Sequence, residues 1–269
     1  MSVKIPIDLH SHTNRSFDGN NSATEMAAQA HELGIGFLAL TDHCEMNEYF
    51  SESYANALKN SYIEAREADL LYKDVTVLAG IEIGQAFSNY EMTDRILASR
   101  EYDFVLSSIH SLPNMKDFYF LSYTAESADY LLVRYFDELY RMVQWGNFDS
   151  VAHLTYPIRY ISGNCKIPID LNKYSNQIDH ILRLMIEKNK ALEINTSGYH
   201  QKLKDSVPNV SIVKRFRELG GKYITIGSDA HSIDALGKGV DKGIEVAKSA
   251  GFEHVTVFKK RQPQLIKLP

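Results

Sequence analysis

Short apolar segments rich in β-branched residues alternate with longer amphipathic segments along almost the whole chain. The short segments are Ile5–Leu9, Gly36–Leu40, Val75–Ile83, Phe104–Ile109, Ser150–Leu154, Ala191–Ile194, Tyr223–Ile226 and Val255–Phe258. Nearly continuous apolar character over four to eight residues is typical of parallel strands buried on both faces. The pattern therefore predicts a parallel sheet covered by helices.

The intervening segments have the apolar spacing and the end signals of helices. The first begins with a capping box, Ser22 to Glu25, and ends at Gly34, which can adopt the left-handed backbone of a helix C-terminus. The others span about Ser53–Tyr72, Glu126–Trp145, Leu171–Lys188, Ser211–Leu219 and Lys238–Ala250. Seven or eight strand–helix units in 269 residues favour a closed βα barrel that forms a single domain over residues 1–269.

Polar residues follow the apolar runs at the point where each predicted strand ends. These strand ends read DLHSH from Asp8, TDH from Thr41, GIEIG from Gly80, SSIH from Ser107, AH from Ala152, EIN from Glu193 and GSDAH from Gly227. In a βα barrel the carboxyl ends of the strands meet at one face. His10 and His12 point the same way, as do Asp229 and His231, because alternate strand residues share a direction. Six of the ten histidines therefore gather on one rim.

Composition narrows the classes of partner and the cellular setting. Lys and Arg number 29 and Asp and Glu 34, so the net charge is −5, which argues against binding to nucleic acid or to a membrane surface. Only two cysteines occur, which excludes a disulfide framework. No apolar run is long enough to span a membrane, and the N-terminal residues lack a signal-peptide core. We expect a soluble, cytoplasmic protein that acts on a small molecule.

Imidazoles and carboxylates gathered on one rim indicate a metal centre. Each motif alone is weak, since HxH can be a surface pair, TDH a turn and GIEIG a strand with one polar residue. Their conjunction at successive strand ends favours metal binding over a structural polar network. The ligands exceed one coordination sphere, so we expect two or three divalent ions of zinc, manganese or iron, with Glu82 as the bridging ligand.

The ordered series DLHSH, TDH, GIEIG, SSIH, VAH and GSDAH resembles the polymerase and histidinol phosphatase (PHP) superfamily of metallophosphoesterases. The resemblance implies a distorted (β/α)7 barrel with a trinuclear centre. By motif, the first metal takes His10, His12, Glu82 and Asp229. The second shares Glu82 and adds His110 and His153, and the third uses His43 and His231. Many relatives have another histidine soon after HxH; here Asp18 is the available substitute, although Asp18-Gly19 could also be a simple turn.

Within this superfamily, residues 192–198 (LEINTSG) and 227–237 (GSDAHSIDALG) are similar to those of histidinol-phosphate phosphatases. This similarity implies hydrolysis of L-histidinol phosphate to L-histidinol and phosphate, a step of histidine biosynthesis. Two alternatives stay open. One is another phosphoesterase of the superfamily, acting on phosphotyrosine or nucleotides, and the other is a non-catalytic module stabilised by metal.

Further residues are candidates for catalysis and substrate binding. Two metals can present a bridging hydroxide to phosphorus, so Glu82 is expected to be catalytic. Asp229 or a metal-bound water is the candidate proton donor to the leaving oxygen. Arg159, just beyond the strand that ends at His153, is placed to bind two phosphate oxygens, although it could be a surface arginine. His200 and Arg15 are further candidates for phosphate binding, and Asp42 and Glu45 for binding the ammonium and imidazole groups of the substrate.

Overall fold

Seven parallel strands form the centre of the molecule. The computed structural model describes residues 7–49 and 54–269. The strands pair in the order β1-β2-β4-β5-β6-β7-β8, so the chain moves around the sheet in one direction. Their bounds are β1 Ile7–Ser11, β2 Phe37–Leu40, β4 Thr76–Gly84, β5 Phe104–Ser108, β6 Ser150–Val151, β7 Ala191–Asn195 and β8 Ile224–Gly227. A short strand, β3 (His43–Glu45), also pairs with β4.

The two ends of this sheet meet and nearly close a barrel. The Asp229 amide donates to the carbonyl of His10, and the His12 amide donates to the carbonyl of Ala230, both at 2.8 Å. Gly227 permits this approach, because a Cβ atom at that position would lie 2.3 Å from Cβ of His10. The predicted α/β barrel with seven parallel strands is therefore confirmed, and the close approach of its first and last strands brings the motifs of the two chain ends together.

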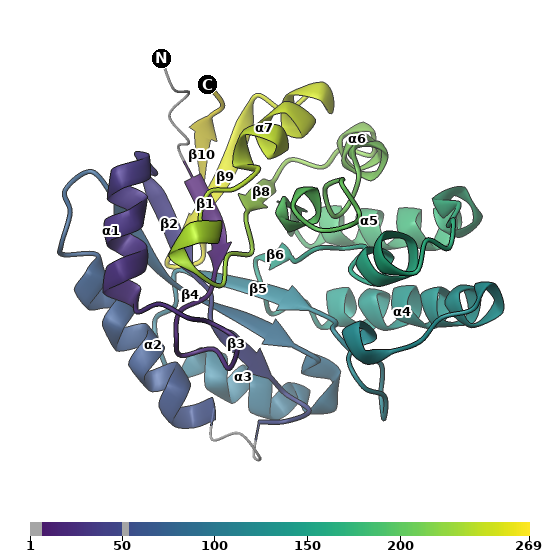
Figure 1. Cartoon of the computed structure of the whole chain (residues 1–269), viewed down its shortest axis with the longest axis horizontal. Coiled ribbons are helices and arrows are strands. Elements are labelled where there is room, and N and C mark those ends of the chain that lie inside the picture. The colour runs from purple at the N-terminus through teal and green to yellow at the C-terminus, as the bar shows by residue number, and fades with distance from the viewer. Residues whose placement is uncertain (1–6, 50–53) are drawn as a thin grey trace.

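Helices lie around the outside of the strands (Figure 1). They are α1 Ala23–Leu33, α2 Tyr54–Ala68, α3 Tyr90–Ala98, α4 Ala125–Trp145, α5 Ser175–Glu187, α6 Val210–Glu218 and α7 Val240–Ser249. The predicted capping box of α1 is present, and Gly34 ends the helix at φ 70°. In Figure 1, α1 and α2 lie on one side of the strands, and α4 and α5 lie on the other. The apolar faces of these helices pack on the strands and form the core.

Three elements differ from the sequence prediction. Helix α3 was not predicted, because it has only nine residues. It begins with Tyr90 and Glu91, and its sequence contains no long apolar pattern. The last predicted strand is the first arm of a hairpin, β9 (His254–Lys259) and β10 (Gln262–Lys267), whose second arm is mostly exposed and therefore lacks apolar alternation. Strand β6 has two residues, shorter than predicted. Ile5 and Ser53, the first residues of a predicted strand and helix, lie outside the described residues.

The hairpin lies at the amino ends of the strands, away from the six histidines at the strand ends. Its turn residue Arg261 donates through Nε to both carboxylate oxygens of Asp149, which precedes β6. The amide of Lys260 donates to the carboxylate of Asp103, which precedes β5. The hairpin thus covers the end of the barrel opposite the polar strand ends.

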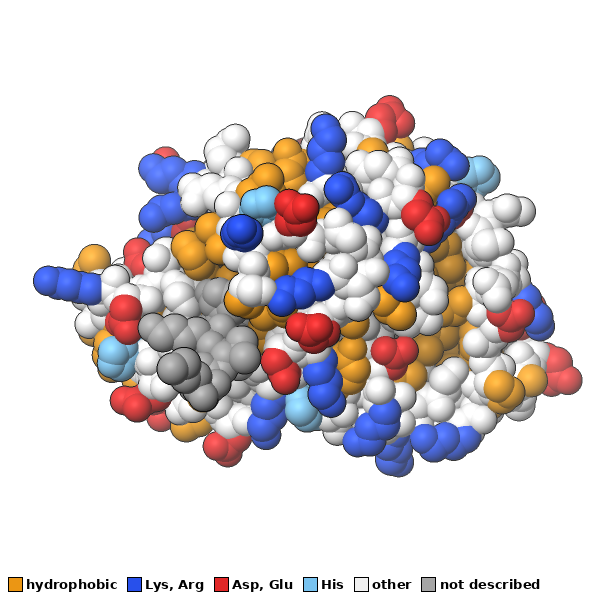
Figure 2. All heavy atoms as spheres, turned by 90° about the horizontal axis from the view of Figure 1, so that it is seen from above, with side chains coloured by type: hydrophobic (Ala, Val, Ile, Leu, Met, Phe, Trp, Pro, Cys, Tyr) orange, Lys and Arg blue, Asp and Glu red, His pale blue; other side chains and the backbone are white. Residues whose placement is uncertain are grey.

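The surface carries charges of both signs. On the face in Figure 2, Lys and Arg side chains are interspersed with Asp and Glu side chains, and hydrophobic side chains are exposed between them. No helix among residues 7–49 and 54–269 combines the length and the hydrophobicity that crossing a bilayer requires.

Candidate active site

The predicted strand-end residues converge at the carboxyl end of the barrel. His10 comes from β1 and His12 directly follows it, His43 comes from β3 and Glu82 from β4, and Asp229 and His231 lie in the segment after β8. His110 and His153 follow β5 and β6. Most of these side chains are buried, and His10 and Glu82 have no exposed surface. His153 and Asp229 have positive φ angles, 25° and 57°, a strained backbone that is common at functional sites.

The two carboxylate oxygens of Glu82 face two different pairs of histidines. Oε2 lies 3.3 Å from Nε2 of His10 and 3.6 Å from Nε2 of His12. Oε1 lies 3.0 Å from Nε2 of His153 and 3.4 Å from Nε2 of His110. A carboxylate arranged in this way can bridge two metal ions, one beside each pair.

The spacing of the imidazole nitrogens fits metal coordination. Nε2 of His10 and Nε2 of His12 are 3.1 Å apart, and those of His110 and His153 are 3.3 Å apart. Two nitrogens bound tetrahedrally to one zinc ion at about 2.0–2.1 Å would be about 3.3 Å apart. Nδ1 of His43 and Oε2 of Glu82 are 3.0 Å apart, yet both are buried and neither has a hydrogen-bond partner among the described residues. These atoms fit metal ligands better than a hydrogen-bonded network.

Asp229 faces the first histidine pair with one oxygen and Arg159 with the other. Its Oδ1 lies 3.4 Å from Nε2 of His12 and 3.6 Å from Nε2 of His10. Its Oδ2 accepts a hydrogen bond from Nη2 of Arg159 at 2.9 Å. Arg159 is therefore not a surface residue: it is 5% exposed, lies on a π-helical turn (Arg159–Asn164), and also donates to Asn195.

A third group of possible ligands lies beside the first pair. Ring nitrogens of His12, His43 and His231 are close enough together to hold one ion. Asp18 lies at this group, with Oδ2 3.1 Å from Nε2 of His231 and Oδ1 3.8 Å from Nε2 of His43. Its position is compatible with the predicted ligand role.

Burial disfavours the charged form of each carboxylate, but the surrounding cations outweigh it. His10, His43 and His110 hold the pKa of Glu82 well below its usual range. His10 and Arg159 do the same for the pKa of Asp229. Both side chains are therefore carboxylates at neutral pH, the form that binds metal.

The histidines divide into two classes. Burial disfavours the imidazolium of His10, but Glu193, Asp229 and Glu82 raise its pKa well above the usual value. Nearby carboxylates likewise overcome burial and raise the pKa values of His43 and His110. Burial, together with neighbouring cations, lowers the pKa values of His12 and His153. Without metal, protons on the imidazoles must balance the negative charge of the carboxylates. A bound metal would displace those protons.

Glu193 is a contact residue of the site whose role the sequence did not predict. Its Oε1 accepts a hydrogen bond from Nδ1 of His10 at 2.6 Å, and its Oε2 accepts one from the amide of His153 at 2.6 Å. The first bond fixes the His10 ring so that Nε2 carries the free lone pair. The available signal was a charged residue in the apolar run of β7, two residues before Asn195.

Two carboxylates predicted to bind the substrate, Asp42 and Glu45, are already engaged by other residues of the protein. Asp42 is buried and accepts hydrogen bonds from Thr13, Ser16 and Ser61, so it holds the loop after β1 and does not line the cavity. Glu45 does line the cavity, but it lies 2.9 Å from Nδ1 of His110 and 3.2 Å from Nδ1 of His43. Its charge is already paired with imidazoles, and it belongs with the possible metal ligands.

Two predicted phosphate-binding residues also lie elsewhere. Arg15 makes a bidentate ion pair with Glu64 of α2 and does not line the cavity. His200 is exposed and packs near Gly239 outside the cavity. Sequence position alone could not show that these side chains turn away from the strand ends.

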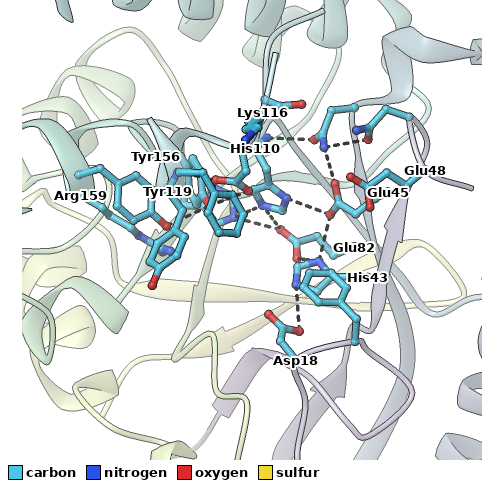
Figure 3. A pocket seen from close by; sticks show the side chains of 18 of the residues that line it. Asp18, His43, Glu45, Glu48, Glu82, His110, Lys116, Tyr119, Tyr156 and Arg159 are labelled. Carbon is cyan, nitrogen blue, oxygen red and sulfur yellow. Dashed lines mark hydrogen bonds and ion pairs between the residues drawn. The ribbon is translucent and has the colours of Figure 1, made fainter. Parts of the chain in front are cut away.

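A cavity of about 490 Å³ opens onto the histidines. Figure 3 shows Glu82 and His43 at its centre, with Arg159, Tyr156 and Tyr119 on one side and Glu45 on the other. Phe17, Tyr119 and Phe120 line the cavity and are more than half exposed. The volume suits a small ligand, and Arg159 beside the histidines suits an anionic group on it.

Comparisons with known proteins show which family the chain belongs to. The chain is 29% identical over 259 residues to a probable histidinol-phosphatase of Thermotoga maritima, covering 95% of this chain and 97% of that protein. It is 28% identical to a probable histidinol-phosphatase of Clostridium acetobutylicum, covering 94% and 97%. The crystal structure of histidinol phosphate phosphatase from Lactococcus lactis, in complex with zinc, L-histidinol and phosphate, superposes with a TM-score of 0.75 at 23% identity, covering 96% of this chain and 98% of that one. Residues 8–197 match the PHP domain, and the protein therefore belongs to the PHP domain family.

Proposed function

We propose that this protein is a metal-dependent phosphatase that hydrolyses L-histidinol phosphate to L-histidinol and phosphate. The observation that carries the proposal is Glu82, whose two oxygens face two pairs of histidines at the base of a cavity that Arg159 also lines. The relatives named histidinol-phosphatase match this chain over more than nine-tenths of its length and supply the substrate.

Two or three divalent ions of zinc, manganese or iron would supply Lewis acidity and a nucleophile at neutral pH. The first would be held by His10, His12, Glu82 and Asp229, the second by Glu82, His110 and His153, and the third by His43, His231 and Asp18. Zinc is supported by its presence in the Lactococcus structure.

Arg159 is the residue that binds the phosphoryl group. Nη2 is engaged by Asp229 and Asn195, whereas the buried Nε has no partner among the described residues. A guanidinium held in this way can donate to phosphate oxygens as their charge grows. Asp229 is held as a carboxylate by its low pKa, so it would bind metal and orient Arg159, while a water molecule would supply the proton for the leaving oxygen.

We further propose that this reaction serves histidine biosynthesis in the cytoplasm. The relatives named histidinol-phosphatase support the reaction, and the biosynthetic role is what the resemblance to histidinol-phosphate phosphatases implies.

The test is kcat/KM measured across L-histidinol phosphate, phosphotyrosine, nucleoside monophosphates and sugar phosphates. We expect L-histidinol phosphate to exceed every other ester by at least tenfold. If another ester exceeds it by about tenfold, roughly 1.4 kcal/mol of transition-state discrimination, the substrate assignment is wrong. Hydrolysis of none of them by metal-loaded protein would favour a non-catalytic module.

A further inference from the structure

Asp117 lines the same cavity beside the histidines. It lies in the segment after β5, directly before a short helix (Phe118–Phe120), and is only partly exposed. Its Oδ1 accepts a hydrogen bond from the amide of Tyr119 at 2.6 Å. The hydroxyl of Tyr156 donates to Oδ1 at 3.1 Å and lies 3.3 Å from Oδ2. These contacts fix the carboxylate at the cavity wall.

The surroundings of Asp117 differ from those of four other carboxylates that line the cavity. Asp18, Glu45, Glu82 and Asp229 line the cavity too, and each lies within 4 Å of a histidine or arginine nitrogen. Within residues 7–49 and 54–269, Asp117 forms no such ion pair, and its hydrogen-bond donors are neutral. A partly buried carboxylate with only neutral donors is an anion that a cationic ligand can pair with.

The position of Asp117 relative to the phosphate site follows from Tyr156. The ring of Tyr156 lies 4.8 Å from that of His110 and 4.9 Å from that of His153. The guanidinium of Arg159 lies over the Tyr156 ring, 5.3 Å from its centroid. Tyr156 thus contacts the possible metal ligands and Arg159 through its ring, and Asp117 through its hydroxyl. In Figure 3 it lies between Arg159 and His110. The carboxylate therefore lies about one tyrosine side chain from the phosphoryl site.

We propose that Asp117 binds the ammonium group of the leaving alcohol and so selects esters that carry a positive charge close to the phosphate. The inference rests on the proposed function, and it assigns to Asp117 the contact that the sequence had suggested for Asp42 or Glu45. The ammonium is the better partner than the imidazole. An aliphatic amine stays charged at neutral pH, whereas an imidazole with a pKa near 6.5 is mostly neutral.

The test uses two esters that differ only in the amine. L-Histidinol phosphate is compared with its deamino analogue, 3-(imidazol-4-yl)propyl phosphate, in the metal-loaded wild type and in Asp117→Asn. We expect the wild type to favour the amine-bearing ester at least tenfold in kcat/KM. Asp117→Asn should lower kcat/KM for that ester about ten- to hundredfold and change hydrolysis of the deamino ester by less than threefold.

Two further variants complete the design. Asp117→Glu keeps the charge and should retain most of the preference. Asp137→Asn, an exposed position on α4 that contacts Gln177, should leave both esters unchanged. A wild type that does not distinguish the two esters overturns the inference. An Asp117→Asn variant that keeps the wild-type preference also overturns it. So does an equal loss of activity on both esters in Asp117→Asn and in Asp117→Glu. Failure of the proposed function gives a different result, because another ester of the panel would then be preferred by the wild type.

Discussion

Glu82 and Asp229 each present their two oxygens to different partners, and the site depends on this division. Glu82 faces one histidine pair with each oxygen, and Asp229 faces a histidine pair and Arg159. Oε2 of Glu82 is buried and has no hydrogen-bond partner among the described residues, as expected of an atom that binds metal. At the scale of residues, the consequences concern Arg159 and Glu193.

Replacing Arg159 with Ala should weaken phosphate binding without removing metal. The lost charge-assisted contact is worth about 1.5–3 kcal/mol, so kcat/KM for histidinol phosphate should fall by one to two orders of magnitude. If the contact strengthens in the transition state, kcat falls as well as kcat/KM. Steady-state kinetics and elemental analysis on the same preparation measure both effects.

Arg15→Ala is the matched control, because Arg15 is paired with Glu64 away from the cavity. It should retain wild-type kinetics. Wild-type kinetics in Arg159→Ala would instead require a different cation at the phosphate site.

Replacing Glu193 with Gln should lower metal affinity. The change keeps the shape of the side chain but removes the charge that orients His10, and such outer ligand contacts typically affect affinity by about 10–100-fold. Competition with a chelator measures the dissociation constant, with Glu187→Gln, an exposed site on α5, as the control. An unchanged constant would mean that Glu193 serves only to hold the backbone of His153.

The sequence predicted which residues reach the rim better than it predicted what each one contacts. The clustered ligands were predictable because strand ends of a parallel barrel share one face. Side-chain direction in the loops was not, and the structure places Arg15, His200 and Asp42 outside the lining of the cavity. The sequence did not predict a role for Asp117, because it does not directly follow a strand and its position depends on Tyr156, which is 39 residues away in sequence.

At the scale of elements, the hairpin β9–β10 joins the amino ends of two strands far from the site. Asp149 is the junction: it accepts from the amide of Val105 in β5 at 2.9 Å and from Nε of Arg261 at 3.0 Å. The sequence predicted β9 from its apolar residues. It could not predict β10, which is held by backbone pairing and presents a largely exposed face.

Asp149→Ala should destabilise the fold and spare the chemistry. The change leaves the buried amide of Val105 and Nε of Arg261 without their acceptor, so the free energy of unfolding should fall by about 1–3 kcal/mol. Urea denaturation measures the loss, and metal content should stay at the wild-type value.

Glu101→Ala removes an exposed carboxylate 3.9 Å from Lys260 in the same hairpin and should change stability by less than about 0.5 kcal/mol. Equal stabilities of the two variants would show that the hairpin contributes little to the barrel.

At the scale of the whole molecule, the buried charges link stability, pH and metal. His10, His43 and His110 have raised pKa values in the folded protein, so they stabilise it below about pH 6.5, their unfolded value. That contribution is lost as the pH rises through the folded pKa values. His12 and His153 have lowered pKa values and are neutral in both states above about pH 7, so they do not change with pH there.

The metal-free protein should therefore lose stability between pH 7 and pH 9, and the metal-loaded protein should not. Metal competes with protons for the same nitrogens, so its stabilising effect grows over this range. Thermal unfolding with and without metal at the two pH values measures the difference. A gap in Tm that shrinks as the pH rises would contradict the assignment of these histidines as ligands.

The number of metal ions bound by active wild-type protein tests the bridged centre most directly. Elemental analysis of protein that has never met a chelator should give two to three equivalents of transition metal per chain, because the ligand groups around Glu82 exceed one coordination sphere. Fewer than one equivalent in fully active protein would contradict a centre bridged by Glu82.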